Sequence, residues 1–188
     1  MWPWEHVAFA YVVYSLSTRA ISQRPPSNRS VYPLAFGALF PDLVDKPLAW
    51  TLGVFPSGYA VGHSLFALPV FATVALVAFR TLHWTRGSVA YSLGHGTHLL
   101  GDVVYPSLVG GPLATSAVLW PLVRIPATPP RRGFVETVTD YFTTWVGTFG
   151  SPETLPLLAF EVSLAALVVA LWVLDGTPGI RPRRAVED

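Results

Sequence analysis

The 188-residue chain contains no cysteine and very little charge. Without cysteine there can be no disulfide, no thiolate zinc site and no cysteine nucleophile. Charged residues make up 12% of the chain, against roughly 25% in soluble proteins. Hydrophobic residues make up 52%, and this imbalance indicates that lipid is part of the solvent. A formal net charge of +1 gives no sign of the strongly basic surface that nucleic-acid binding requires.

Several familiar catalytic motifs are also absent. The chain has no Gly-x-Ser-x-Gly nucleophile elbow, no Walker phosphate loop and no His-Glu-x-x-His zinc motif. The N-terminus lacks the basic region and the cleavage site of a signal peptide, so we expect it to be retained. Enzymatic chemistry would therefore have to come from residues scattered along the sequence.

Long apolar stretches predict an all-α fold, a polytopic integral membrane helical bundle with about five to seven membrane-embedded segments. Each clear stretch is close to the ~20 residues that cross a hydrocarbon core. We predict one membrane-embedded domain over residues 1–175 and a disordered cytoplasmic tail over residues 176–188. The clear spans are residues 62–80, 88–105 and 155–174, with 4–21 as a less apolar fourth.

Three further stretches are harder to assign. Residues 32–40 and 111–123 are too short to cross easily, since thirteen helical residues reach only roughly 20 Å. We expect them to be half-helices shielded from lipid by protein. Residues 134–149 are rich in threonine and aromatic residues and fit either a span or an interfacial helix.

The distribution of arginine along the chain predicts how it is oriented in the membrane. Four arginine-rich segments alternate with loops that lack arginine, and the positive-inside rule assigns the arginine-rich ends to the cytoplasm. The N-terminus and the arginine-free loops are then predicted to lie outside. This requires an even number of crossings between successive clusters, which are Arg19/Arg24/Arg29, Arg80/Arg86, Arg124/Arg131/Arg132 and Arg181/Arg183/Arg184.

Polar residues of metal-ligating type occur in four separate segments, and the topology places all of them toward the outer side. His6 and His63 are predicted at the starts of helices, and Asp42 in an outer loop. His98 and Asp102 fall in the later half of the 88–105 span, four residues apart and hence on one helical face. The sequence therefore predicts one shared metal site near the extracytoplasmic face.

His95 shares that helical face within a ~60° arc, so we include it among the candidate ligands. The glycines around it, Gly94, Gly96 and Gly101, would let another helix approach closely. The structural alternative is a polar stripe that holds helices together, which is the usual role of a lone histidine within a membrane. Contributions from four segments favour the metal site.

Histidine with carboxylate suits zinc first, with manganese or iron as alternatives, and one or two ions could be held. Hydrolysis is the economical chemistry for such a site. Asp45 and Glu161 are the candidate general bases, although Asp45 could simply belong to a turn and Glu161 could pair with a neighbouring helix. His83 is expected at the membrane interface.

Two other classes of function remain open. The same polar cluster could belong to a non-enzymatic ion- or proton-binding membrane protein or transporter, with Glu161 and Asp140 lining a path. Bis-histidine haem ligation is a further alternative, but it leaves both Asp42 and Asp102 unexplained.

These motifs resemble the YdjM-like family of inner-membrane proteins assigned as metal-dependent hydrolases. Two departures stand out: Asp45 follows Asp42 by three residues where the family has two, and Gly58-Tyr59 replaces a His-Arg pair. The resemblance implies a membrane-bound hydrolase distantly similar to zinc-dependent phospholipases C, acting on a phosphoester of a lipid or amphiphile. The matching segments are Glu5-His6, Leu39 to Asp45, Gly62-His63-Ser64-Leu65, Gly94 to Asp102, Tyr105-Pro106 and Leu119-Trp120-Pro121.

Overall fold

The computed structural model describes residues 1–127, 133–149 and 154–180, and these residues form helices and no strands. The predicted all-α class is confirmed. The elements are α1 (Pro3–Ser22), α2 (Val31–Trp50), α3 (Leu68–Thr81), α4 (Thr85–Leu108), the short 3-10 helix η1 (Thr115–Val118), α5 (Phe134–Thr148) and α6 (Leu155–Leu174).

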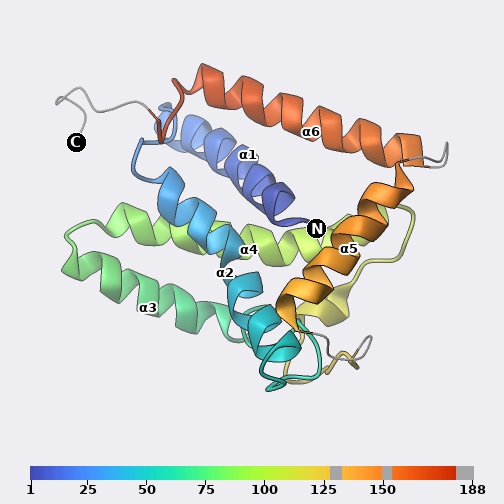
Figure 1. Cartoon of the computed structure of the whole chain (residues 1–188). Coiled ribbons are helices and arrows are strands. Elements are labelled where there is room, and N and C mark those ends of the chain that lie inside the picture. The colour runs from blue at the N-terminus through green and yellow to red at the C-terminus, as the bar shows by residue number, and fades with distance from the viewer. Residues whose placement is uncertain (128–132, 150–153, 181–188) are drawn as a thin grey trace.

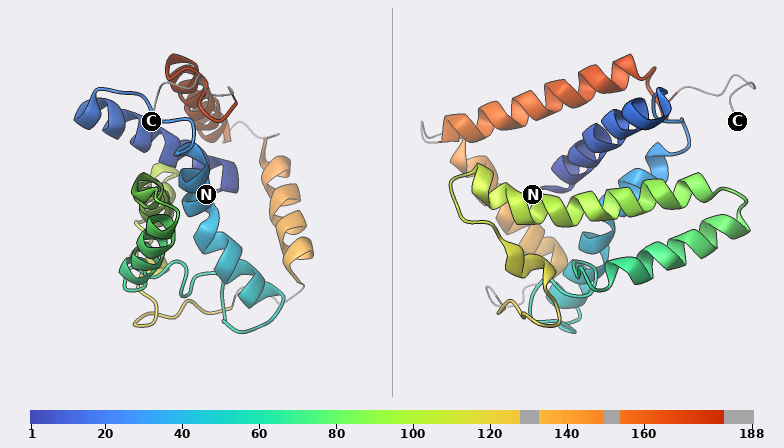
Figure 2. Two further views of the ribbon diagram at one scale, coloured as in Figure 1. Left: turned by 90° about the vertical axis from the view of Figure 1, so that its left-hand side faces the viewer. Right: turned by 180° about the vertical axis from the view of Figure 1, so that it is seen from behind.

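Helices α1, α2 and α4 form the centre of the molecule (Figure 1). The pairing of α2 with α4 is the most extensive, α3 lies along α4, and α6 lies along α1. The two further views show α5 at one side of the molecule (Figure 2), where it contacts α2 and packs Trp145 against Trp4 of α1. The chain is therefore a three-helix core with three more peripheral helices.

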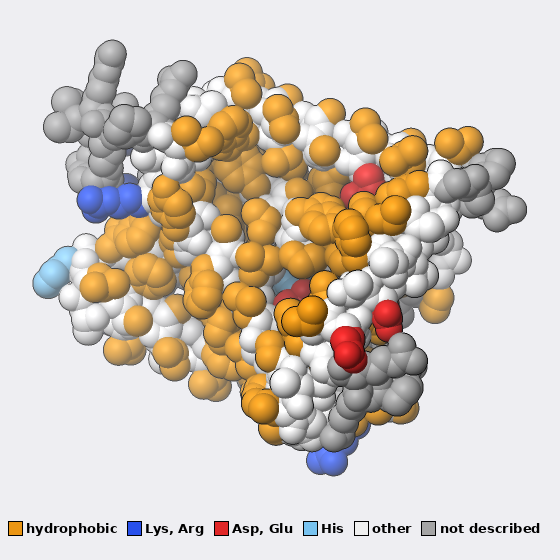
Figure 3. Space-filling model, in the orientation of Figure 1, with side chains coloured by type: hydrophobic (Ala, Val, Ile, Leu, Met, Phe, Trp, Pro, Cys, Tyr) orange, Lys and Arg blue, Asp and Glu red, His pale blue; other side chains and the backbone are white. Residues whose placement is uncertain are grey.

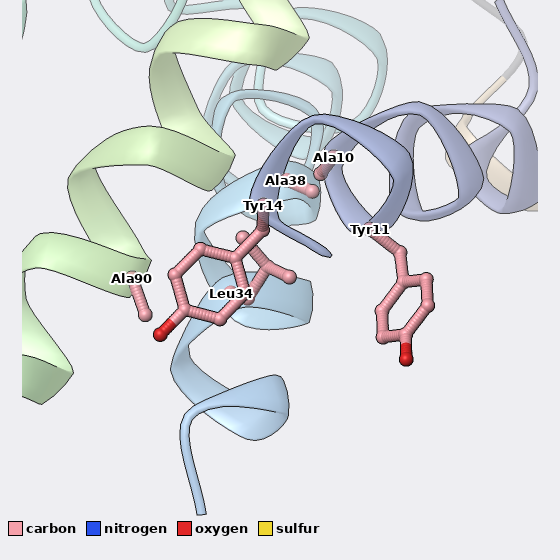
Figure 4. Close-up of a cluster of buried hydrophobic side chains, with 6 residues drawn as sticks. All are labelled: Ala10, Tyr11, Tyr14, Leu34, Ala38 and Ala90. Carbon is pink, nitrogen blue, oxygen red and sulfur yellow. The ribbon is translucent and has the colours of Figure 1, made fainter. Parts of the chain in front are cut away.

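Small side chains let the three central helices approach one another. The buried cluster combines three alanines with Leu34 and two tyrosines (Figure 4). Packing of small residues is the usual way for helices to associate in lipid. Its members are Ala10, Tyr11, Tyr14, Leu34, Ala38 and Ala90.

Two glycines set the distance between α2 and α4. A Cβ atom at Gly37 would lie 2.1 Å from the carbonyl oxygen of Tyr91, and one at Gly94 would lie 2.2 Å from that of Leu34. The backbones are thus in direct contact. The prediction of a close approach is confirmed at Gly94 but is wrong at Gly96, where a Cβ atom would meet nothing within 4 Å.

Helix α2 is longer than the sequence suggested. A short segment over 32–40 followed by a loop was expected, but α2 continues through Pro41 and Pro47 to Trp50. Asp42 and Asp45 therefore lie on a helix, and the predicted loop position of Asp42 is wrong. A proline removes one helical hydrogen bond, but in a buried helix the neighbouring protein can compensate for that loss.

Two other boundaries are corrected. Residues 62–67 form turns and α3 begins at Leu68, so His63 precedes its helix instead of opening it. No half-helix covers 111–123, where the structure has only η1. Gly110 takes a positive φ of 90° and Pro112 cannot donate a backbone hydrogen bond, so α4 does not continue into this segment.

Of the helices in the described ranges, α6 is the one long and apolar enough to cross a membrane. None of its residues is buried. Helix α3 is apolar but shorter, and α5, at 15 residues, would reach roughly 22 Å. The number of five to seven embedded segments stays a prediction.

The described arginine-containing segments lie at two ends of the molecule (Figure 1). The connection from α1 to α2 and the turn from α3 to α4 lie at the same end of the molecule as the last turn of α6 (Figure 1). The segment that contains Arg124 lies at the other end, because the chain runs the molecule's length once along α4 after Arg86. The number of membrane crossings between these clusters stays a prediction. Arg131, Arg132 and the arginines after residue 180 lie outside the described residues.

The start of the predicted disordered tail is packed. Tyr32 donates a hydrogen bond to the carbonyl of Gly179 at 2.7 Å, and the Trp172 indole donates to that of Pro178 at 3.0 Å. Residues 176–180 thus bind the end of α6 to the start of α2. The rest of the tail, 181–188, lies outside the described residues.

Candidate metal centre

Four side chains from three parts of the chain converge on one point. Asp42 comes from α2, His63 from the turn before α3, and His98 and Asp102 from α4. The His63 Nε2 atom lies 3.3 Å from Asp42 Oδ1 and 3.4 Å from Asp102 Oδ2. The His98 Nε2 atom lies 3.4 Å from Asp102 Oδ2, 3.8 Å from Asp42 Oδ1 and 3.1 Å from His63 Nε2.

These separations match the edges of a metal coordination tetrahedron. With metal–ligand bonds of about 2.0–2.1 Å, two ligand atoms of a tetrahedral zinc site lie about 3.3–3.4 Å apart. The five measured distances scatter around that value. These five distances are compatible with ligands of a metal ion, and two trios of side chains, Asp42/His63/His98 and His6/His98/Asp102, could each hold one.

His6 joins the same cluster from α1. Its Nε2 atom lies 3.3 Å from Asp102 Oδ1, and its ring stacks on His98 with centroids 3.7 Å apart. The two oxygens of Asp102 thus face different partners: Oδ1 faces His6, and Oδ2 faces His63 and His98. We call Asp42, His63, His98, Asp102 and His6 the ligand cluster.

Burial makes the cluster costly unless a cation is present. His63 and His98 are 0% exposed, His6 is 1% exposed, and each aspartate is 7% exposed. Buried charges of this kind need a partner. Asp42 Oδ1 is buried without a hydrogen-bond partner in the described structure.

The outer nitrogens of two histidines are already used. His63 Nδ1 lies 2.8 Å from Asp45 Oδ2, and His98 Nδ1 lies 2.6 Å from the carbonyl oxygen of Ala38. Both partners only accept, so both Nδ1 atoms donate. When both rings are neutral, each Nε2 presents a lone pair toward the other ring and toward the carboxylates. A shared cation stabilises such a set of acceptors.

Asp45 positions His63 and is not placed as a general base. Its carboxylate accepts backbone hydrogen bonds from Ala60, Gly62 and His63 at 2.8–3.0 Å, besides the bond from the His63 ring. A carboxylate occupied in this way lies behind the ring, away from the ligand cluster. These contacts give Asp45 a positioning role toward His63, and its catalytic role stays a prediction.

His95 and Glu161 lie outside the ligand cluster. His95 Nε2 lies 2.8 Å from the carbonyl oxygen of Gly62, so this ring braces the turn that carries His63. It is absent from both groups of potential ligands in the described residues, and its metal role stays a prediction. Glu161, on α6, interacts with Glu5 and Tyr105 instead.

The turn before α3 is also held from the side of η1. Ser64 Oγ donates to the carbonyl of Trp120 at 2.6 Å, and the Leu65 amide donates to that of Val118 at 2.9 Å. The Leu119-Trp120-Pro121 motif thus supports the segment that presents His63.

Sequence reasoning missed two residues beside the cluster. Lys46 Nζ lies 2.6 Å from Asp42 Oδ2, and the Tyr59 ring packs edge-on against His63 at 4.8 Å. Burial, reinforced by Asp102 and Asp42, raises the pKa of the Tyr59 hydroxyl above its usual range, so the hydroxyl keeps its proton. Lys46 could have been identified from the sequence, because it is the only lysine and follows Asp42 by four residues. No sequence pattern pointed to Tyr59.

The polar cluster can be seen from one face of the molecule. Figure 3 shows carboxylate and histidine atoms at the bottom of a hollow whose rim is formed by hydrophobic side chains. A polar centre within an apolar rim suits a ligand that is itself amphiphilic.

Fold and site together define an all-helical protein with a buried histidine–carboxylate cluster of metal-binding type. The chain belongs to the YdjM inner membrane protein family, which matches residues 1–177. The protein is thus a membrane protein, and the match extends well beyond the segments that carried the resemblance in the sequence. Comparison with curated proteins and with solved structures finds no match.

Proposed function

We propose that this protein is a membrane-bound metal-dependent hydrolase. The observation that carries the proposal is the spacing within the ligand cluster, where five nitrogen–oxygen and nitrogen–nitrogen pairs lie 3.1–3.8 Å apart. Asp42, His63, His98 and Asp102 would hold one ion. His6, with the second oxygen of Asp102, gives a place for another.

Zinc fits this donor set best. Two or three imidazoles with carboxylate oxygens and no thiolate are typical of catalytic zinc sites, while manganese and iron accept the same ligands. A divalent ion held here would supply Lewis acidity toward a phosphoryl or carbonyl oxygen and would lower the pKa of a bound water toward neutrality.

The surroundings favour a phosphoester of a lipid or amphiphile as substrate. The hydrophobic rim in Figure 3 suits an apolar tail, and membership of an inner membrane family places the protein among lipids. Tyr59, which retains its proton beside the cluster, can donate a hydrogen bond to a substrate oxygen. The alternative of an ion or proton path gains little support, because Asp140 is exposed on α5 and Glu161 lies outside the cluster.

Elemental analysis and turnover together test the proposal. Detergent-purified protein should contain about one or two divalent ions per chain. It should hydrolyse a generic phosphodiester, lose this activity with a chelator and regain it when divalent metal is added. A metal-loaded protein that turns over no phosphodiester, phospholipid or ester would favour the binder or transporter instead.

A further inference from the structure

We propose that Lys46 forms an oxyanion subsite beside the metal centre and binds an anionic oxygen of the substrate's phosphoryl group. This inference rests on the proposed function and deepens it. It assigns a residue that selects anionic phosphoesters over uncharged esters.

Lys46 stands at the boundary between the ligand cluster and the outside. It lies four residues after Asp42 on α2, so both side chains project from one face of the helix, and Nζ lies 2.6 Å from Asp42 Oδ2. Its side chain is 20% exposed, whereas His63 and His98 are fully buried. An anion that approaches the buried ligands on this side would meet Nζ.

The lysine stem is held in place. A Cβ atom at Gly58 would lie only 3.1 Å from Lys46 Cγ, so the absence of a side chain at position 58 makes room for the stem. Nζ also lies 5.7 Å from the centroid of the Trp50 ring. A restrained lysine loses less side-chain entropy when it binds a ligand than a free one does.

Nζ has hydrogen-bonding capacity to spare. An ammonium group has three donors. Asp42 is its one ion-pair partner among the described residues, and the Trp50 ring offers a face rather than an acceptor. The remaining donors can bind an oxyanion while the contact with Asp42 persists.

Lys46 also offsets part of the negative charge of the aspartates around the metal centre. The three aspartates of the centre, Asp42, Asp45 and Asp102, outweigh one divalent ion by a single negative charge. The Met1 ammonium lies 3.5 Å from Asp102 Oδ1, and Lys46 is the positive charge beside Asp42. An anionic substrate oxygen that approaches Asp42 without Lys46 would meet its negative charge in a region of low dielectric, where electrostatic interactions are strong.

The competing role for Lys46 is to hold Asp42 in position for the metal. That role predicts loss of metal affinity when the lysine is replaced. The oxyanion subsite predicts loss of anion affinity while the metal stays bound. Binding measurements with the metal, a charged probe and an uncharged probe separate the two.

The test titrates inorganic phosphate and then imidazole into zinc-loaded full-length protein in detergent, by calorimetry, for the wild type, Lys46→Met and Lys46→Arg. We expect Lys46→Met to keep its zinc and its imidazole affinity but to bind phosphate about 10- to 100-fold more weakly, as loss of a charged hydrogen bond does. Lys46→Arg should retain most of the phosphate affinity.

The proposal is overturned if zinc-loaded Lys46→Met binds phosphate as the wild type does, or if the zinc-loaded wild type binds no phosphate. It is also overturned if zinc, imidazole and phosphate binding fall together, since that is the positioning role. In each of these cases the wild type would still bind zinc, so the proposed function would not be contradicted. A wild type without divalent metal would instead remove the proposed function and this inference together.

Discussion

Helices α4 and α6 have similar lengths, 24 and 20 residues, but opposite surroundings. Helix α4 buries residues on much of its surface, including His95, His98 and Asp102, and contacts α1, α2, α3 and η1. Helix α6 has no buried residue and is apolar apart from Glu161 and Ser163. Its one extensive helix contact is with α1.

This difference separates two uses of a helix in one membrane protein. Helix α6 satisfies its own backbone and is apolar enough to face lipid, and Val168, Leu171 and Trp172 pack against the core cluster. Helix α4 carries titratable groups that are tolerable in an apolar setting only when partners from α1, α2 and the turn before α3 surround them. Stability and function should therefore be concentrated in α1, α2 and α4.

Removal of a ligand in α4 should have the largest effect. His98→Ala or Asp102→Ala should lower bound metal several-fold and lower the melting temperature, because a bound ion stabilises the folded state by about 2.7 kcal/mol at 100 times its Kd. Elemental analysis and thermal unfolding measure both quantities. His83→Ala, at an exposed position, is the control and should change neither. Unchanged metal in both ligand variants would eliminate the site.

Asp45→Asn tests whether Asp45 orients the His63 ring, and it removes no residue of the ligand cluster. The amide can no longer match both the backbone donors and the His63 Nδ1 proton, so the ring loses its fixed orientation. Metal affinity should fall about 10- to 100-fold, measured by competition with a chelator. A normal metal affinity with a large loss of turnover would instead restore Asp45 as a catalytic base.

A matched leucine pair compares the two regions directly. Leu34→Ala opens a cavity in the core, where Leu34 is 2% exposed, and should cost about 2–5 kcal/mol of unfolding free energy. Leu167→Ala on α6, where Leu167 is 47% exposed, should change it by less than about 0.5 kcal/mol. Denaturation of both variants in the same detergent measures the difference. Equal losses would mean that α6 is packed against protein.

The smallest effect is expected from two neighbouring glycines of α4. Gly94→Ala places a methyl group against the backbone of α2 and should cost about 1–3 kcal/mol, with weaker metal binding because His98 moves away from Ala38. Gly96→Ala meets open space and should be neutral or stabilising by up to about 1 kcal/mol. If both variants behave alike, the contact between α2 and α4 is not tight at Gly94.

Membership of an inner membrane family and the single clear span leave the orientation of the site as a prediction. The arginine pattern suggested this orientation, and the segment that contains Arg124 lies at the opposite end of the molecule from the turn between α3 and α4. A positive-inside count depends on knowing which segments cross. The chain direction along α4 and the 3-10 geometry of η1 could not be read from hydropathy.

The sequence by itself determined the helical class, the bounds of α6 and the types of residue that could bind a metal. Apolar length and residue chemistry are local properties, so they can be read without a structure. It also brought the His98–Asp102 pair onto one face, because helical spacing fixes that geometry.

Only the tertiary structure decided how those residues are used. Asp45 and His95 have the same chemistry as ligands, yet each braces the segment of His63 because of where α2 and α4 place it. Lys46 and Tyr59 reach the cluster through packing between α2 and the following loop. The contact at Gly37 and Gly94 fixes this geometry, because metal-ligand distances must match within tenths of an ångström, and no local sequence pattern specifies a distance between two helices.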